Sequence, residues 1–212
     1  MTRARAQLPA NPMSISLAFT HRRLWWQTDD GDHMPERWDV SADVGRLVAC
    51  PADHRHVGDI ELVIADLRRK RNPLDSAELG EWALEFIAEA VIDPEYGRFA
   101  PELDALLSDG VARMVIVRGF HIVEAWRGHG LGALLIAGTL RSLARAARLA
   151  ACRVAPDGFR NTTADRVSAE LASVRIGAML EKIGFVRWNG VHVIDLRDPA
   201  LLDVRLDVLD QW

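Results

Sequence analysis

The sequence is poor in cysteine, tyrosine and lysine, and it lacks any long apolar run. It holds two cysteines, one tyrosine and, among 26 cationic residues, only the lysines Lys70 and Lys182. The longest nearly uncharged stretch, Leu131 to Leu140, is far shorter than the roughly 20 residues that a membrane-spanning helix needs. Residues 1–12 carry no apolar core of the kind found in secretory signals. We therefore expect a cytoplasmic protein without a membrane partner.

The two cysteines, Cys50 and Cys152, are far apart in the chain, and neither has a second thiol at the spacing of a metal or redox motif. This arrangement suits a reducing compartment, so we expect two buried small hydrophobic residues, no disulfide and no metal site. The net charge of −4 argues against nucleic acid as a partner, because phosphate neutralisation needs an excess of positive charge.

The chain has the size and composition of one ordinary domain, with 212 residues of which 49% are hydrophobic and 26% charged. We expect a flexible arm at residues 1–12 and a single domain at 13–212. The N-terminal third is β-like: apolar and β-branched residues predict strands at 14–20, 46–50 and 59–66, and the polar segment 28–36 predicts a loop.

Beyond residue 72 the pattern alternates between helices and strands. Asp75 and Glu78 have the spacing of a capping box, and Pro101 suits the first turn of a second helix. Helices are predicted at 75–91, 101–108, 133–149 and 168–183, and strands at 114–124, with a bulge at 118–119, and at 151–155, 185–188 and 191–196. Asn189-Gly190 predicts a tight hairpin between the last two strands. The tail, 201–212, is compatible with a helix, a strand or an interface segment.

Three glycines at alternate positions lie between the strand at 114–124 and the helix that follows it. The segment reads Arg127-Gly128-His129-Gly130-Leu131-Gly132. Glycines allow the backbone to approach a bulky anion closely, and the first turn of the helix offers unpaired N–H groups and a positive dipole end. The spacing fits neither a dinucleotide-binding loop nor a P-loop. We interpret it as a phosphate-binding loop rather than a flexible turn.

The loop resembles the signature of the GNAT superfamily of acyl-CoA-dependent acetyltransferases, Arg/Gln-x-x-Gly-x-Gly/Ala, with Arg127, Gly130 and Gly132 in the signature positions. The strand end His121–Arg127 and the block Met179–Phe185 are similar to further family features, in the same order. The resemblance covers about 114–196 and places the cofactor-binding half at about 112–196. It implies an α/β fold with a mixed central sheet, a splay between two parallel strands, and helices on both faces.

The same resemblance implies how an acyl-CoA would be held. The loop amides would hold the CoA pyrophosphate, and backbone groups near Val123 would pair with the pantetheine arm. Ser173 stands at a helix position where the family often has an asparagine. The cofactor-binding residues implied in this way are Val123, Arg127, Gly128, His129, Gly130, Leu131, Gly132, Ala133 and Ser173.

Acyl transfer to an amine needs a base near the strand that precedes the loop. Glu124 and His121 are the nearest ionisable residues, and strict alternation would place them on opposite faces of the strand. We favour Glu124, directly or through a water molecule, and keep His121 as the second candidate. The tyrosine that often serves the family as general acid is replaced here by Leu180.

The sequence therefore predicts an N-acetyltransferase that uses acetyl-CoA or another acyl-CoA as co-substrate and a small-molecule or peptide amine as acceptor. The alternative is a CoA-binding regulatory or scaffold module without catalysis, and an oxidoreductase is a remote third interpretation. The helices at 75–109 precede the glycine-loop strand, whereas the family usually has its helical pair between the first two strands, so the acceptor stays undefined. The apolar and acidic tail makes a homodimer contact conceivable.

Overall fold

The computed structural model describes residues 8–21, 35–67, 82–156 and 165–209. Its main strands are β1 (Ile15–His21), β2 (Glu36–Val44), β3 (His56–Asp66), β6 (Arg113–Ile122), β7 (Leu149–Cys152), β8 (Val186–Trp188) and β9 (Val191–Asp195). Its helices are α1 (Trp82–Val91), α2 (Pro101–Asp104), α3 (Leu131–Leu143), α4 (Arg166–Lys182) and α5 (Ala200–Leu209). A small ribbon of β4 (Ile92–Asp93) and β5 (Arg98–Phe99) follows α1, and 3-10 turns occupy η1 (Pro12–Ser14), η3 (Ala52–His54) and η5 (Glu124–Trp126).

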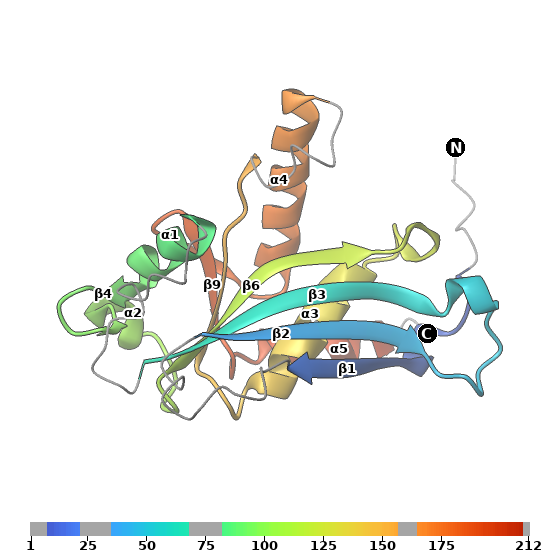
Figure 1. The fold of residues 1–212 in the computed structure, drawn as a ribbon, viewed down its shortest axis with the longest axis horizontal. Coiled ribbons are helices and arrows are strands. Elements are labelled where there is room, and N and C mark those ends of the chain that lie inside the picture. Colours follow the sequence, from blue (N-terminus) through green and yellow to red (C-terminus); the bar gives the residue numbers. More distant parts are fainter. Residues whose placement is uncertain (1–7, 22–34, 68–81, 157–164, 210–212) are drawn as a thin grey trace, which may run out of the picture.

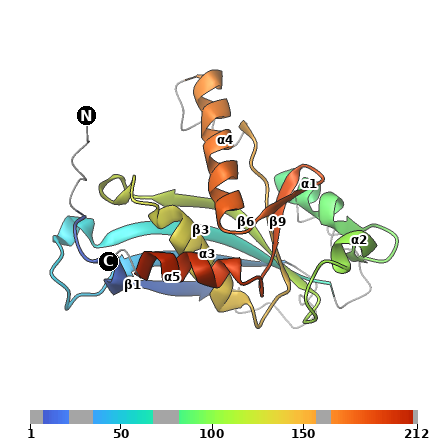
Figure 2. The same cartoon turned by 180° about the vertical axis from the view of Figure 1, so that it is seen from behind.

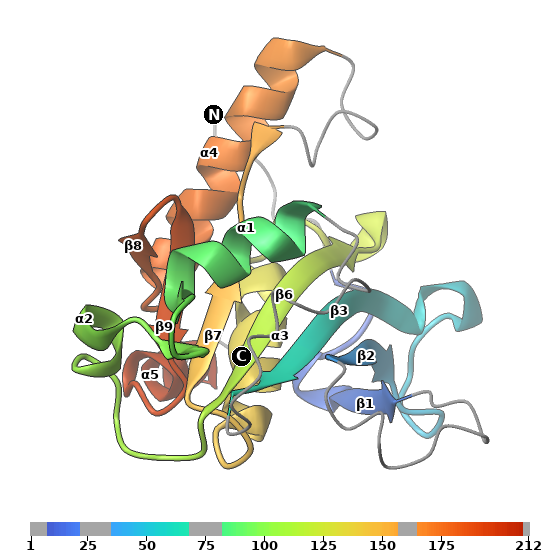
Figure 3. The ribbon, with the colours of Figure 1, turned by 60° about the vertical axis from the view of Figure 1, so that its left-hand side comes forward.

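One seven-stranded sheet organises the fold, in the order β1-β2-β3-β6-β7-β9-β8 (Figure 1). Every neighbouring pair is antiparallel except β6 and β7, which run parallel over Met114–Val117 and Leu149–Cys152. After Val117, β6 continues to Ile122 while β7 has ended, and Figure 3 shows the two strands separating. The mixed sheet with a splayed parallel pair, predicted from the resemblance, is confirmed.

Helices cover both faces of this sheet. On one face α3 and α5 lie across the first strands (Figure 2), and their apolar side chains join those of β1, β2, β3 and the end of α4 in one core. On the other face α1 and α2 cover β6, β7 and β9 through a second core, which includes Ile87, Val91, Ile116 and Val193. The face of β2 and β3 on that second side carries polar residues instead.

A β-bulge separates the two environments along β3 and β6. The pairing register shifts between Glu61 and Leu62, where Arg118 becomes the extra residue of β6. Because the extra residue reverses the alternation along the bulged strand, Val115 and Val117 before the bulge and Phe120 and Ile122 after it all contact the α3 core. The bulge predicted at Arg118 and Gly119 is therefore confirmed.

Other local predictions had mixed outcomes. The hairpin at Asn189-Gly190 is confirmed, with both residues at positive φ (42° and 83°) as a tight hairpin turn requires. The predicted strand at 46–50 is wrong, because these residues form a turn beyond β2. The helix predicted at 133–149 runs instead from 131 to 143, and residue 149 already starts β7. The helix at 101–108 shortens to α2, and the tail is helix α5.

Some predictions fall on segments outside the described residues. These segments include most of the loop at 28–36, the start of the helix at 75–91 with its capping box, and most of the arm at 1–12. The helices between β3 and β6 do lie before the glycine-loop strand, as the sequence predicted. Cys152 is buried as expected, whereas Cys50 is only partly buried, and both are free thiols.

Candidate functional site

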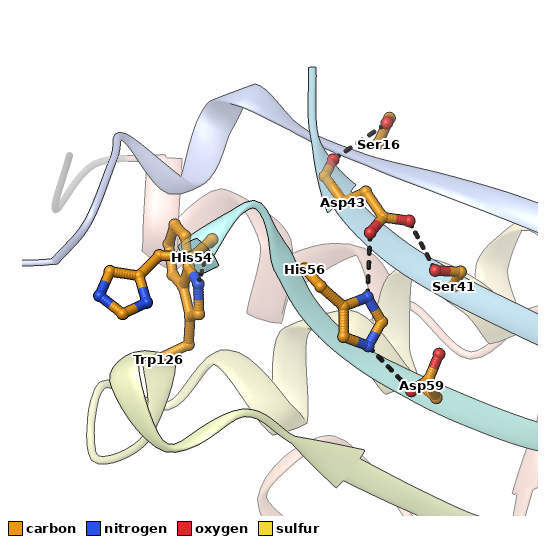
Figure 4. A network of polar contacts seen from close by, with 7 residues as sticks. All are labelled: Ser16, Ser41, Asp43, His54, His56, Asp59 and Trp126. Carbon is orange, nitrogen blue, oxygen red and sulfur yellow. Dashed lines mark hydrogen bonds and ion pairs between the residues drawn. The ribbon is translucent and has the colours of Figure 1, made fainter. Parts of the chain in front are cut away.

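A buried tryptophan fixes the turn that leads into the glycine loop. Trp126 closes η5 and is fully buried. Its indole N–H donates to the backbone oxygen of His54, at 2.9 Å, on the segment before β3 (Figure 4). Since an indole both fills the core and finds its polar partner here, the start of the loop is attached to η3, just before β3, as well as to β6.

The glycine loop presents an uncapped helix start. Gly128 and Gly130 lie at φ 86° and 76°, a left-handed region that side chains disfavour. Gly130 is the N-cap of α3, where no side chain accepts a hydrogen bond from the first turn, and that turn contains no acidic residue. The N–H groups of the first turn and the positive end of the helix dipole are therefore available to an anion.

A hollow of about 200 Å³ opens directly on this helix start. Met179 of α4 closes its far side, and a methyl group at Gly132 would already touch the side chains of Phe120, Ile122 and Met179, at 3.6 to 3.7 Å. The hollow is lined by Ile122, Trp126, Arg127, Gly128, Gly130, Leu131, Gly132, Ala133 and Met179. Of the predicted cofactor residues, six line this one hollow.

The free edge of β6 lies beside the same hollow. The N–H of Val123 donates to the carbonyl of Val57 on β3, at 2.9 Å. Because backbone groups alternate between the two edges of a strand, those of Ile122 and Phe120 point to the opposite edge, where β7 has ended. The backbone groups that face the gap therefore belong to Ile122 and Phe120. Those of Val123 pair with β3 instead.

Arg127 links the loop to this strand. Its Nε donates to the carbonyl oxygen of Ile122 at 2.6 Å, and its Nη2 lies 2.9 Å from Nε2 of His121. A guanidinium has no acceptor atom, so His121 Nε2 accepts and the ring carries its proton on Nδ1. The cation at the loop entrance and the candidate base are therefore in direct contact.

The two candidate bases lie in different settings. His121 is exposed on β6 and pairs in register with Asp59 of β3, so both side chains share the open polar face of the sheet. Glu124 has left the strand and is the exposed first residue of η5. The alternation that was expected to separate the two residues ends at Ile122, before it reaches Glu124.

Beside His121, a second histidine bridges two carboxylates. His56 contacts Asp43 through Nδ1 and Asp59 through Nε2, each at 2.9 Å, and Ser41 donates to the other oxygen of Asp43 (Figure 4). The hydrogen bond to Asp43, followed by Asp59, raises the pKa of His56 although partial burial opposes the change. This network was not predicted from the sequence, because its residues come from strand β2, which was not predicted, and from the start of β3.

Helix α4 supplies no general acid at the expected position. Leu180 is fully buried in the core. Ser173, the weakly implied pantetheine contact, donates its hydroxyl to the carbonyl of Glu170 in its own helix, at 2.8 Å. His129 is half-buried in the loop. The described contacts thus give Ser173 a local partner and concentrate the cofactor candidates in the loop.

A buried histidine that sequence reasoning overlooked lies under α4. His192 of β9 is 8% exposed, and neither ring nitrogen has a hydrogen-bond partner among the described residues. The nearest carboxylate oxygen, on Glu181, is 3.8 Å from Nε2. Burial, assisted by the charge of Arg187, lowers the pKa of His192 against the opposing effect of Glu181. Its surroundings therefore favour the neutral ring.

The other face of the sheet near the gap is bounded by α1. Trp188 donates its indole N–H to the carbonyl of Ala90, at 3.0 Å, and the guanidinium of Arg153 lies over the ring of Phe86. Trp38 is half-buried and stacks on His21. Among the described residues no helix has the length and apolar character needed to cross a bilayer, and no cluster of His, Cys, Asp and Glu is arranged to hold a metal.

Comparison with known proteins gives distant structural likenesses only. No protein-family model matches the sequence, and no curated protein matches it either. The structure is similar to that of a tyrosine-to-phenylalanine mutant of KacT, with a TM-score of 0.37, 11% identity and coverage of 83% of this chain and 78% of that one. It is also similar to AtaTR bound with AcCoA, with a TM-score of 0.38, 11% identity and coverage of 88% and 98%.

The topology itself has the features that the resemblance to the GNAT superfamily implies. The parallel pair β6 and β7 diverges, the glycine loop follows β6, and α3 begins at that loop. The hairpin of β8 and β9 completes the sheet beside β7. The fold therefore agrees with that resemblance over the half of the chain that carries the motif.

Proposed function

We propose that the protein transfers an acetyl or other short acyl group from acyl-CoA to a primary amine. The observation that carries this proposal is the uncapped start of α3, with left-handed Gly130, opening on a hollow beside the free edge of β6. The helix start can bind an anion, and the strand edge can bind an extended arm. CoA has both parts, because its pyrophosphate is joined to a pantetheine. A phosphate alone would use only the first of these features.

Within this proposal, the chain's own groups have separate roles. The first-turn amides and Arg127 bind the diphosphate, and the N–H groups of Phe120 and Ile122 on the open edge of β6 align the arm and offer a donor to the carbonyl oxygen. The amine nitrogen attacks the thioester carbonyl, the new C–N bond forms, and the C–S bond breaks. The amine proton passes to the base, and the thiolate that leaves takes a proton from solvent.

His121 is the base that the geometry favours over Glu124. Its ring lies on the open face beside the strand edge, and its unprotonated Nε2, which contacts Arg127 Nη2 in the ligand-free chain, becomes free to take the amine proton when that guanidinium turns to the diphosphate. Glu124 lies beyond the end of β6, on η5, and is not among the residues that line the hollow. We expect His121→Gln to lower kcat about 100-fold and to leave the affinity for CoA nearly unchanged, whereas Glu124→Gln should retain activity.

The absence of a general acid at Leu180 is compatible with turnover. A thiol of pKa about 8.5 leaves as thiolate near neutral pH, whereas an ammonium of pKa about 10.4 must lose its proton before it attacks. The base therefore matters more than the acid.

A second candidate function is a CoA-binding module without catalysis. It is favoured by the buried Leu180, which occupies the position expected for a general acid. Thiol release from acetyl-CoA, measured with polyamines, aminoglycosides, amino acids and peptides, separates the two. Release with at least one amine, reduced in His121→Gln, supports the enzyme. Tight CoA binding with no thiol release from any amine would favour the module, and no CoA binding would refute both.

A further inference from the structure

An apolar stripe runs along the solvent side of α4. Val167, Leu171 and Val174 are 64%, 52% and 66% exposed, and Ala178 continues their line. Spacings of four, three and four residues place all of them on one side of a helix. In Figures 1 and 3 the N-terminal half of α4 stands clear of the sheet and of the other helices. A second molecule therefore has access to the stripe.

The stripe is distinct from the side of α4 that packs in the fold. Ala169, Gly177 and Leu180 are the buried residues of the helix, and they lie on the opposite side. Within the described part of the chain, nothing covers the three large side chains. Apolar residues scattered singly over a surface need no explanation, but these three are contiguous and follow a coiled-coil spacing.

Charged residues flank the stripe with opposite signs. Glu170 precedes Leu171 on one flank, and Arg175 follows Val174 on the other. In a parallel pair of helices with Leu171 at position a and Val174 at position d, a residue at g faces the residue five positions later, at e, on the partner. Glu170 of each copy then faces Arg175 of the other, so the stripe is complementary to itself.

We propose that α4 is a self-association surface, on which a second copy of the chain pairs its own α4 in parallel about a two-fold axis. The opposite charges on the two flanks of the stripe favour a second copy of the chain as the partner. A membrane surface, or a partner with charge of one sign, would complement only one flank. Glu170 now pairs with Arg166 in its own helix, at 3.0 Å and in solvent. Such exposed ion pairs contribute little to stability. Glu170 can therefore leave Arg166 for Arg175 of the second copy at a small cost in free energy.

The expected dimer is weak. The stripe spans less than two heptads and places only a few large side chains in the interface, which corresponds to the small end of specific interfaces. We expect a dissociation constant of about 10 to 100 μM. Helix α5, in the tail that the sequence suggested as a dimer contact, packs one side against α3, and the present proposal places the pairing on α4.

Sedimentation equilibrium over a range of protein concentrations tests the pairing. Leu171→Glu places two carboxylates opposite each other at the centre and should weaken the dimer about 100-fold or more. Leu206→Glu is the matched control, because Leu206 on α5 is 47% exposed, and it should leave the dimer unchanged. A wild-type chain that stays monomeric at about 500 μM, well above the expected dissociation constant, or a dimer that Leu171→Glu does not weaken, overturns the proposal.

A charge exchange tests the parallel register. Glu170→Arg alone and Arg175→Glu alone should each weaken the dimer several-fold, and the double variant should recover wild-type affinity. Failure of the double variant to recover would contradict the assigned pairing. Circular dichroism checks that each variant keeps its fold, and CoA binding serves as an independent control, since it should stay unchanged in every variant whether or not the chain is an acetyltransferase.

Discussion

A carboxylate placed at the start of α3 should weaken CoA binding through its charge alone. Gly130 is the position for this test, because an added Cβ there meets nothing within 4 Å and the backbone is left-handed at φ 76°. Glutamate and glutamine have nearly the same volume. Gly130→Glu and Gly130→Gln therefore incur the same backbone strain, about 1 to 2 kcal/mol, and differ in one negative charge.

The size of the charge effect follows from the geometry of the loop. A side chain on Gly130 begins at the N-cap of α3, within reach of any anion bound by the first-turn amides. At about 6 Å, with an effective dielectric constant of about 20 to 40, one unit of phosphate charge repels the carboxylate by about 1.4 to 2.8 kcal/mol. We expect Gly130→Glu to bind CoA about 30-fold more weakly than Gly130→Gln.

Isothermal titration calorimetry of both variants with CoA measures this difference, and repetition at high salt should shrink it, because the charges are partly exposed to solvent. Circular dichroism establishes that the two variants are equally folded. Equal dissociation constants for the two folded variants, at low as at high salt, would show that no diphosphate lies at this helix start.

Three further predictions concern stability, each measured by urea unfolding. Gly58→Ala should destabilise the fold by about 3 kcal/mol, because a Cβ there overlaps the carbonyl oxygen of His121 across β3 and β6; a change below about 1 kcal/mol would contradict this close approach. His192→Leu should be neutral or stabilising by about 1 kcal/mol at pH 7, because both ring nitrogens lack partners among the described residues. Since the pKa of His192 is lowered in the fold, the wild type loses stability as the pH falls below 6.5, so the advantage of the variant should grow from pH 7 to pH 5; a shrinking advantage would refute the lowered pKa. The pKa of His56 is raised, so its contribution is present below pH 6.5 and lost as the pH rises through the folded value. His56→Gln should therefore cost stability at pH 5.5, by about 0.5 kcal/mol at most for this exposed network, and none at pH 9; a larger cost at pH 9 would contradict the assignment.

The sequence predicted the half of the fold that carries the glycine loop well because its signals are local. The glycine loop, the bulge at Arg118 and the Asn189-Gly190 turn each depend on a few adjacent residues with special backbone requirements. The splay of β6 and β7 was predicted from the family resemblance. No local sequence pattern shows where one strand continues beyond the end of its neighbour.

Strand β2 was missed although its pattern was available. Val40, Ala42 and Val44 are buried while the residues between them are more exposed, which is the alternation of a half-buried strand. The charged residues at its start obscured that alternation. The His56 network depended on β2 pairing with β3, so it could not be predicted without the strand.

Contacts between distant elements lay beyond sequence reasoning. The hydrogen bond from Trp126 to His54 and the contact of Arg127 with His121 arise where η5 turns back toward β3. The helix predicted at 133–149 was too long because apolar Ala147 continues the helical spacing, whereas the chain turns after Leu143 and Leu149 pairs with Met114 in the sheet. Tertiary pairing thus overrode local propensity at that boundary.

A crystal structure of the complex with CoA would locate the bound diphosphate. We expect the diphosphate within hydrogen-bond distance of the amides of α3's first turn, with the pantetheine along the free edge of β6 at Phe120 and Ile122. A diphosphate bound elsewhere on the chain, with the start of α3 facing only solvent, would contradict this expectation.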